Sequence, residues 1–378
     1  MTQKVTVLGA GMVGSAVAVD LARSGFAVTS VDARPEALAE VSARSPGVET
    51  VRADCASAAA IQRVVAGADL VVGALASSMG LPTLRAVLDA RKTYVDISFM
   101  AEDAWELDAY AKERGVTAVI DCGVGPGVSN LLVGYGASQL DACESVEIYV
   151  GGLPVVRTWP YAYKAPFSPH DVLEEYTRPA RLVEHGRVVV KEALSEPELM
   201  DFPEVGTLEA FNTDGLRSLA YTMKAPFMKE KTLRYPGHIE LMRALRHTGL
   251  FSKEPLAVAG GTVRPLDVAA ALLFPKWAYE EGEGDLTVMR VIVAGTKDGR
   301  AVRHEWELFD RYDPMTDVRS MSRTTGYAAT SMVALLAAGR FKEPGVFPPE
   351  LLAKEPGLVD AFLAEYDARG VRVTYRTR

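Results

Sequence analysis

The sequence predicts an α/β protein: an N-terminal Rossmann domain with a doubly wound parallel sheet, followed by an α+β domain with a mixed or antiparallel sheet. Three observations support this prediction. A glycine-spaced turn joins an apolar strand to a helix at residues 4–14, and strands alternate with helices as far as about residue 122. From Glu144 onward that alternation gives way to paired strands and aromatic-rich connections. A chain of 378 residues also exceeds one typical core, so two domains are expected.

The glycine-rich turn has the sequence K-V-T-V-L-G-A-G-M-V-G. Gly9 allows a sharp turn at the strand end, Gly11 leaves room for a pyrophosphate, and Gly14 lets the helix pack closely on the strand. The phosphates would then lie at the helix N-terminus, beside Met12 and Val13. The turn therefore predicts a dinucleotide site, and the alternative is a purely structural βαβ unit.

The second strand, F-A-V-T-S-V-D, ends in Asp32. An acidic residue at this place accepts hydrogen bonds from the adenosine ribose and repels a 2′-phosphate. NAD is therefore the expected cofactor rather than NADP, although Arg34, two residues further on, could soften the discrimination.

Further strands are expected at 48–54, 68–75, 93–98 and 116–121, with helices at 58–66, 81–90 and 101–114 between them. In a parallel sheet the carboxyl ends of all strands share one edge, where the cofactor binds. The residues at the carboxyl ends of two of these strands are therefore further cofactor candidates: Asp54, Ala74, Leu75 and Ser77.

A second loop, D-C-G-V-G-P-G-V-S-N, spans residues 121–130, between a strand and an apolar helix. Its glycines and proline at the same edge of the sheet predict a functional loop, and a simple turn is the alternative. Gly123 and Asn130 are the cofactor candidates in it, and Ser129 is expected to cap the helix.

The domain boundary is expected near residue 122. Residues 1–122, completed by 324–378, would form the NAD-binding domain, and residues 123–323 a substrate-binding and dimerisation domain. Two hairpins are predicted in the latter, one turning at His185-Gly186 and one at Asp298-Gly299. An open sheet commonly supports self-association, so a homo-oligomer, most simply a dimer, is expected. In the C-terminal part, P-G-V-F-P-P-E should be extended and residues 357–369 helical.

Composition narrows the classes of partner. The formal net charge is −8, hydrophobic residues make up 48% and charged residues 24%, and no basic cluster long enough to follow phosphates occurs. A nucleic-acid partner is therefore not expected. No apolar run reaches bilayer length and no secretion signal precedes the first strand, which predicts a cytoplasmic protein without a membrane partner. Cys55, Cys122 and Cys143 lack metal-ligand or disulfide spacing, so no metal is expected.

Several longer motifs resemble the saccharopine dehydrogenase-like family, and within it the lysine 6-dehydrogenases. They are G-A-G-M-V-G (9–14), D-C-G-V-G-P-G-V-S-N-L-L (121–132), G-Y-G-A-S-Q-L-D (134–141), Y-V-G-G-L-P (149–154), T-L-R-Y-P-G-H (232–238), V-R-P-L-D-V (263–268) and R-V-I-V-A-G-T-K-D-G (290–299). The resemblance covers the whole chain. It implies NAD-dependent oxidation of the ε-amine of L-lysine to 2-aminoadipate 6-semialdehyde, which cyclises, with release of ammonia.

Branch markers within the family disagree about the substrate. Gly125, before the Pro-Gly of the second loop, is typical of the lysine dehydrogenases. D-I-S-F (96–99) and T-D-G-L-R-S-L (213–219) look closer to the saccharopine side. A saccharopine or carboxynorspermidine dehydrogenase, which joins or splits a C–N bond between two small molecules, is therefore the alternative. A Rossmann protein that binds NAD as a sensor without turnover is a third reading.

Oxidation of an alkylammonium requires that it first lose a proton, because hydride leaves carbon only when the nitrogen can donate electrons. Asp96 and Asp121 end strands at the cofactor edge, and His238 lies in a segment that resembles the family's R-Y-x-G-H motif. These three residues are the candidate proton acceptors, and capping or turn roles are the alternatives.

An amino-acid substrate also needs its carboxylate held, which a planar guanidinium does with two hydrogen bonds. Arg234 is the first candidate, with Arg323 and Arg264 behind it. Tyr163, Phe167 and Ser168 lie in an aromatic connection that resembles the family's substrate-lining segment. They could instead belong to the core.

Overall fold

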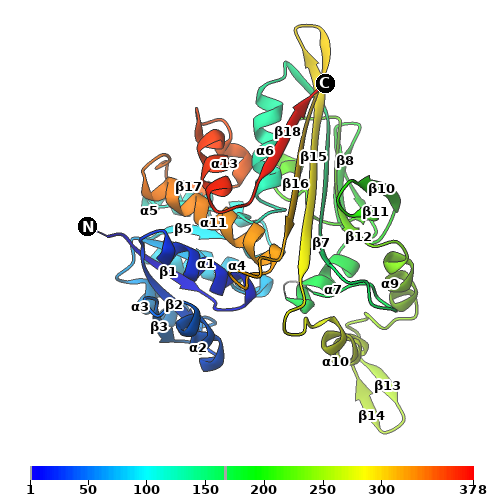
Figure 1. The fold of residues 1–378 in the computed structure, drawn as a ribbon, viewed down its shortest axis with the longest axis horizontal. Coiled ribbons are helices and arrows are strands. Elements are labelled where there is room, and N and C mark those ends of the chain that lie inside the picture. The colour runs from blue at the N-terminus through cyan, green and yellow to red at the C-terminus, as the bar shows by residue number, and fades with distance from the viewer. Residues whose placement is uncertain (1, 166–167) are drawn as a thin grey trace. The chain divides into compact units, whose positions relative to one another are not determined.

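A computed structural model describes residues 2–165 and 168–378. The chain divides into two compact units (Figure 1): Met1–Gln139 with Ser322–Val373, and Leu140–Met321 with Thr374–Arg378. Among the described residues, no helix has both the length and the apolarity needed to cross a membrane.

The first unit is built on a parallel sheet with the strand order β17-β6-β5-β4-β1-β2-β3. Apart from β17, this is the strand order of a Rossmann fold, so the predicted fold class is confirmed. The strands are β1 (Lys4–Leu8), β2 (Ala27–Asp32), β3 (Glu49–Arg52), β4 (Leu70–Gly73), β5 (Thr93–Asp96), β6 (Thr117–Val119) and β17 (Gly345–Phe347).

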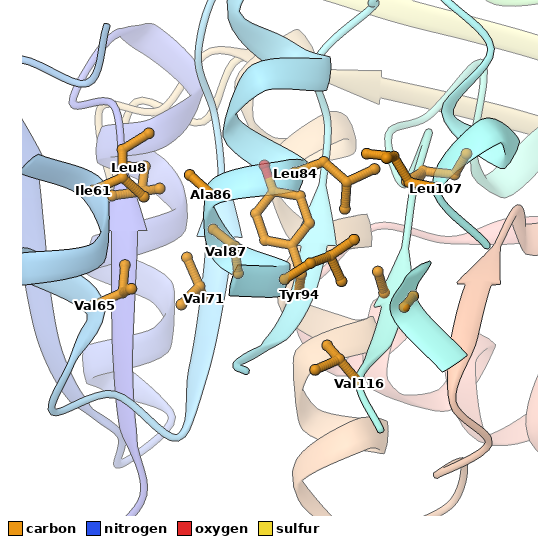
Figure 2. Close-up of a cluster of buried hydrophobic side chains, with 14 of the residues drawn as sticks. Leu8, Ile61, Val65, Val71, Leu84, Ala86, Val87, Tyr94, Leu107 and Val116 are labelled. Atoms are coloured by element: carbon orange, nitrogen blue, oxygen red, sulfur yellow. The ribbon is translucent and has the colours of Figure 1, made fainter. Parts of the chain in front are cut away.

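Helices follow the strands of this sheet. They are α1 (Met12–Arg23), α2 (Pro35–Arg44), α3 (Ala58–Val65), α4 (Gly80–Asp89), α5 (Asp108–Arg114), α6 (Val128–Ser138), α12 (Pro349–Leu352) and α13 (Leu358–Ala368), with most of α11 (Ser320–Ala337). One apolar core joins strands β1, β4, β5 and β6 to helices α3, α4 and α5. Figure 2 shows the ring of Tyr94 within this core, among Val71, Leu84 and Val87.

Strand β17 comes from the segment expected only to be extended. It pairs in parallel with β6, from Gly345 opposite Thr117 to Phe347 opposite Val119. Side chains satisfy its other edge, because the Val346 amide donates to Asp108 Oδ1 at 3.0 Å and the Val346 carbonyl accepts from Trp105 Nε1 at 2.9 Å. Such side-chain pairing protects an edge strand against further strand addition.

The unit boundary at Gln139 lies beyond the one expected at residue 122, because α6 packs within the first unit. A Cβ atom on Gly134 of α6 would come 2.4 Å from the backbone oxygen of Glu350 in α12. The end of the chain also differs from expectation, since Thr374–Arg378 belong to the second unit. The sequence predicted no strand there, whereas β18 (Val373–Thr377) joins the second sheet.

The second unit contains a mixed sheet, as predicted. Its main order is β10-β11-β12-β7-β15-β16-β18, with β8 paired to β12 and β9 to β8. β12 and β7 run parallel, and β7 and β15 antiparallel. The remaining strands are β7 (Ala142–Pro154), β8 (Ala180–Glu184), β9 (Arg187–Lys191), β10 (Glu198–Phe202), β11 (Gly206–Asn212), β12 (Phe227–Arg234), β15 (Asp285–Lys297) and β16 (Arg300–Arg311).

Both predicted hairpins form. His185 and Gly186 join β8 to β9 with φ angles of 51° and 73°, and Asp298 and Gly299 join β15 to β16 with 49° and 73°. Two central residues with positive φ match the twist of the strands, which is why X-Gly turns favour tight hairpins.

Helices α7 (Pro169–Thr177), α9 (His238–His247) and α10 (Pro265–Trp277) share an apolar core with strand β11 through Phe211. A short helix, α8 (Leu219–Thr222), follows the loop after β11. The hairpin of β13 (Leu256–Val258) and β14 (Gly261–Val263) is a separate two-stranded sheet that precedes α10 (Figure 1).

Candidate functional site

The glycine turn between β1 and α1 has two positions where the protein itself excludes a side chain. Gly9 has a φ of 101°, and a Cβ there would come 2.3 Å from the Ala74 carbonyl oxygen. A Cβ on Gly14 would come 2.0 Å from the Gly9 carbonyl oxygen. These contacts confirm the expected turn and the close approach of helix and strand.

Gly11 differs from both, because a Cβ at this position would have only Arg34 Nη2 within 4 Å, at 3.9 Å. Protein packing therefore does not require glycine here. Gly11 is the N-cap of α1, so no side chain caps this end of the helix, and Met12 and Val13 begin its first turn. An open space beside free helix amides fits the pyrophosphate of a dinucleotide.

Asp32 ends β2 and is held from two sides. Its Oδ2 accepts from the Ala10 amide at 2.8 Å, and Arg34 donates Nε to Oδ1 and Nη2 to Oδ2, each at 3.1 Å. Burial raises the pKa of Asp32, but hydrogen bonds from Arg34 and Ala10 outweigh burial and hold the pKa below its ordinary value. Asp32 is therefore an anion whose charge Arg34 partly neutralises.

The other cofactor candidates in the first half of the sheet lie at its carboxyl edge. Ala74 and Leu75 follow β4 and are half-buried, and the Ala74 amide donates to the Leu8 carbonyl at 2.8 Å. Ser77 begins a short 3₁₀ turn. Asp54 is exposed and accepts from the Ala56 amide at 2.9 Å, which closes the turn after β3.

Gly123 and Asn130 shape the second loop at this edge. The Gly123 amide donates to the Pro126 carbonyl at 3.0 Å. Asn130 Oδ1 accepts from Ser129 Oγ at 3.0 Å and from the Gly127 amide at 3.4 Å, while its Nδ2 is buried without an acceptor among the described residues. Helix α6 is thus capped by Gly127 and Asn130, and the expectation that Ser129 is the N-cap is wrong.

Asp96, the last residue of β5, is 1% exposed and accepts hydrogen bonds at both oxygens. Tyr94 Oη donates to Oδ1 at 2.7 Å, and Ser98 donates to Oδ2 from Oγ at 2.5 Å and from its amide at 3.0 Å. The opposite residue of β4 must be glycine, because a Cβ on Gly73 would come 2.4 Å from Asp96 Oδ1.

Asp121 lies two residues beyond β6, is 4% exposed and has a left-handed φ of 51°. The amide of the next residue, Cys122, donates to the Asp96 carbonyl at 2.7 Å, so the ends of β5 and β6 are tied together. Burial and, to a smaller extent, the charge of Asp121 raise the pKa of Asp96 to about 7, against the hydrogen bonds from Ser98 and Tyr94. This pair of carboxyl groups can take up or release a proton near neutral pH.

His238 lies in the second unit, where it begins α9 and is 2% exposed. Its Nδ1 donates to the Tyr161 carbonyl at 2.8 Å, and its Nε2 accepts from Tyr176 Oη at 2.9 Å. Because a carbonyl only accepts, the proton resides on Nδ1. Burial lowers the pKa of His238 to about 3, and the charge of Arg234 contributes. The imidazole is therefore neutral at physiological pH.

Arg234, at the end of β12, is 2% exposed and already faces a carboxylate of the protein. Its Nη2 donates to Glu175 Oε2 at 2.6 Å, its Nη1 to the Leu233 carbonyl at 2.9 Å, and its Nε to Tyr176 Oη at 3.3 Å. The guanidinium carbon lies 4.5 Å from the centre of the Tyr163 ring. The structure thus brings together Arg234, Tyr163 and His238 in one buried polar cluster.

The remaining substrate candidates make other contacts. Ser168 caps α7, accepting from the Asp171 amide at 3.4 Å. Arg323, in the first unit, donates to the Gly370 carbonyl at 3.3 Å, and Arg264 forms an exposed pair with Asp267. Phe167 lies outside the described residues.

Sequence reasoning missed Glu230, on the same face of β12 as Arg234. It is 4% exposed, and burial raises its pKa to about 8. Its Oε2 accepts from Thr213 Oγ1 at 2.6 Å. The available signal was an acidic residue within a run of charged and polar residues, K-E-K-T, in the strand F-M-K-E-K-T-L-R. Among the described residues, no group of three or more His, Cys, Asp or Glu side chains is placed to hold a metal ion.

The Rossmann sheet, its glycine turn and the acidic residue ending β2 define a dinucleotide-binding protein with a second, mixed-sheet unit. Family comparison agrees over nearly the whole chain. The saccharopine dehydrogenase NADP binding domain matches residues 5–119, and the saccharopine dehydrogenase C-terminal domain matches residues 123–371. The chain belongs to the saccharopine dehydrogenase family, an oxidoreductase family that binds a nicotinamide cofactor.

Curated relatives are distant. Carboxynorspermidine synthase of Vibrio cholerae is 27% identical over 77% of this chain and 74% of its own length. Carboxyaminopropylagmatine dehydrogenase of Synechocystis sp. is 24% identical over 97% of this chain and 96% of its own length. Among solved structures, apo saccharopine dehydrogenase (L-Glu forming) from Saccharomyces cerevisiae superposes with a TM-score of 0.81 at 19% identity. The match covers 100% of each of the two chains, which supports the fold.

Proposed function

We propose that this chain is a dehydrogenase that oxidises the ε-amine of L-lysine to 2-aminoadipate 6-semialdehyde, with release of ammonia. The observation that carries the proposal is the buried carboxyl pair of Asp96 and Asp121 at the carboxyl edge of the Rossmann sheet. Burial, aided by the charge of Asp121, raises the pKa of Asp96 to about 7. An alkylammonium with an ordinary pKa of about 10.4 needs such a group to accept its proton before hydride can leave.

When bound, the nicotinamide cofactor supplies the hydride acceptor. The open position at Gly11 and the amides of Met12 and Val13 would hold the pyrophosphate, and Asp32 would accept from the adenosine ribose. We propose NAD as the preferred cofactor on the strength of Asp32. Arg34, which forms an ion pair with Asp32, would favour NADP instead, since a guanidinium released from that pair could bind a 2′-phosphate.

A second candidate is favoured by the names of the relatives. Two that cover most of this chain are a carboxynorspermidine synthase and a carboxyaminopropylagmatine dehydrogenase, and a third, of Pyricularia oryzae, is a saccharopine dehydrogenase [NADP(+), L-glutamate-forming]. We therefore include a secondary amine that carries a carboxyl group as the alternative substrate. The same carboxyl pair would handle its proton.

A substrate panel tests both candidates. Formation of reduced cofactor is followed by absorbance with L-lysine, L-ornithine, saccharopine or carboxynorspermidine, each with NAD and with NADP. Release of ammonia with lysine supports the first proposal, and turnover of saccharopine or carboxynorspermidine alone replaces it with the second. Asp96→Asn should abolish most turnover, whereas Asp267→Asn, at an exposed surface pair, should not. Cofactor binding without turnover of any amine would favour a sensor.

A further inference from the structure

Tyr94 reaches Asp96 from the interior of the first unit. The two residues lie two positions apart on β5, so their side chains point to the same face of the sheet. The Tyr94 ring is fully buried, with Leu84 and Val87 among its apolar neighbours (Figure 2). Its hydroxyl group donates to Asp96 Oδ1 at 2.7 Å. The apolar core thus supplies a hydrogen-bond donor to a carboxyl group at the carboxyl edge of the sheet.

The neighbouring strand fits closely around this pair. Gly73 of β4 lies opposite Asp96. A Cβ on Gly73 would come 1.8 Å from Tyr94 Oη and 2.4 Å from Asp96 Oδ1. The hydroxyl group and the carboxylate therefore fill the space that a side chain at this position would need, and they have no room to move toward β4.

The two oxygens of Asp96 accept unequal numbers of hydrogen bonds. Oδ2 accepts from Ser98 Oγ at 2.5 Å and from the Ser98 amide at 3.0 Å. Oδ1 accepts from Tyr94 alone among the described residues. Each carboxylate oxygen has about two acceptor sites, so Oδ2 is occupied and Oδ1 keeps one site for a proton. Tyr94 thus holds the oxygen at which a proton is expected to arrive.

Other titratable groups approach the pair from neighbouring elements: Asp121 beyond β6, Cys122 in the second loop and Cys55 before α3. Burial raises the pKa of Asp96, the charge of Asp121 adds to this effect, and hydrogen bonds to the carboxylate oppose it. Burial also raises the pKa of both thiols, so they are uncharged near pH 7. Asp121 therefore disfavours the Asp96 anion, and Tyr94 favours it.

We propose that Tyr94 is a positioning residue for the reaction, whose hydroxyl group holds Asp96 Oδ1 in one orientation and stabilises the anion that accepts the proton of the amine. The inference rests on the proposed function, because it assigns this proton transfer to Asp96. Tyr94 acts only through Asp96, since its own side chain is buried in the core. Burial and the charge of Asp96 raise the pKa of Tyr94, so its phenol keeps its proton and remains a donor.

The test compares two tyrosine variants by the dependence of kcat/KM on pH, with an amine that the substrate panel shows to be turned over. Tyr94→Phe removes a donor from the ionised form of Asp96, so the rise of kcat/KM that follows loss of the Asp96 proton should move upward by about 1 to 2 pH units. Tyr110→Phe is the matched control, because Tyr110 also donates to an aspartate, Asp89, at a half-buried place in the same unit. It should leave the rise where it is. An unshifted rise in Tyr94→Phe would overturn the inference.

Unfolding in urea provides a second measurement that needs no turnover. The loss of stability caused by Tyr94→Phe should be small at pH 5, where Asp96 is protonated, and should grow as pH passes about 7. In an Asp96→Asn protein this dependence on pH should vanish. A loss of equal size at every pH would mean that Tyr94 only fills the core, which would overturn the inference.

The two measurements separate this inference from the proposed function. A panel without turnover would end the proposed function, and the stability profile would still decide whether Tyr94 holds the Asp96 anion. If Tyr94→Phe does not fold, 3-fluorotyrosine at position 94 keeps the ring and the hydroxyl group and makes the hydroxyl a stronger donor. The rise of kcat/KM should then move to lower pH, and an unshifted rise would again count against the inference.

Discussion

The guanidinium of Arg234 and the carboxylate of Glu175 form an ion pair of 2.6 Å in the interior of the second unit. Arg234 is 2% exposed, and the Glu175 side chain is 17% exposed. Burial raises the pKa of Glu175, while Arg234 acts to lower it. Each charge thus depends on the other for compensation.

Arg234→Ala should therefore reduce stability by about 3 to 5 kcal/mol, because it leaves the Glu175 charge buried without its partner. The free energy of unfolding in urea measures this loss. Replacing both residues by leucine should recover much of it, since removing both charges also removes the uncompensated one. A stable Arg234→Ala protein whose defect is confined to the KM of the amine would instead restore Arg234 as the carboxylate anchor.

Two glycines of the same turn should respond differently to alanine. Gly14→Ala places a methyl group 2.0 Å from the Gly9 carbonyl oxygen and should destabilise the first unit. Gly11→Ala meets nothing closer than 3.9 Å and has an ordinary φ of −72°, so the protein should fold normally.

Gly11→Ala should nevertheless weaken cofactor binding roughly tenfold or more, because loss of one charge-assisted hydrogen bond already costs about 1.5 to 3 kcal/mol. Thermal unfolding and fluorescence titration with the reduced cofactor separate the two effects. Normal cofactor affinity in Gly11→Ala would place the pyrophosphate elsewhere.

Cofactor choice should depend on the pair formed by Arg34 and Asp32. Removing the guanidinium in Arg34→Ala leaves the Asp32 carboxylate uncompensated, which should lower kcat/KM for NADP roughly 10- to 100-fold relative to NAD. Arg63→Ala, at an exposed site in the same unit, is the control. An unchanged ratio would mean that Arg34 takes no part in the choice.

Local features of the sequence were sufficient for much of the fold. The roles of Gly9 and Gly14 and the two X-Gly hairpins depend on backbone conformation within a few residues, and the structure confirms them. Strand β17 escaped prediction because three residues between prolines carry no periodicity. Its pairing with β6 joins segments more than two hundred residues apart, and only the tertiary structure provides that contact.

The candidate site was harder to predict for the same reason. Asp96 and Asp121 could be placed together because both lie at the carboxyl ends of parallel strands. The motif around Arg234 could not reveal that α7 supplies Glu175 as its partner. Nor could the sequence show that Glu230 fixes the loop before Arg217, since this depends on the approach of Gly215 to β12.

The last prediction concerns pH and stability. Asp96 has its pKa raised from 3.8 to about 7, so between these values the unfolded chain releases a proton that the folded protein keeps. The stabilisation is therefore complete below the lower value and is lost as pH rises to about 7. The pKa of Glu230 is raised from 4.5 to about 8, so Glu230 adds a similar loss of stability that continues up to a higher pH. Asp96→Asn and Glu230→Gln should each remove the loss of stability that belongs to the replaced group. The free energy of unfolding in urea, measured across this pH range, tests this.

Activity should report the same proton. If deprotonated Asp96 accepts the proton of the amine, kcat/KM should rise as pH passes about 7, and a further rise should follow toward the amine's own pKa of about 10.4. Asp96→Asn should remove the first rise and keep the second, which belongs to the substrate. Asp121→Asn removes the like charge that raises the pKa of Asp96, so the first rise should move to lower pH. A first rise that both variants retain unshifted would assign the proton transfer to another group.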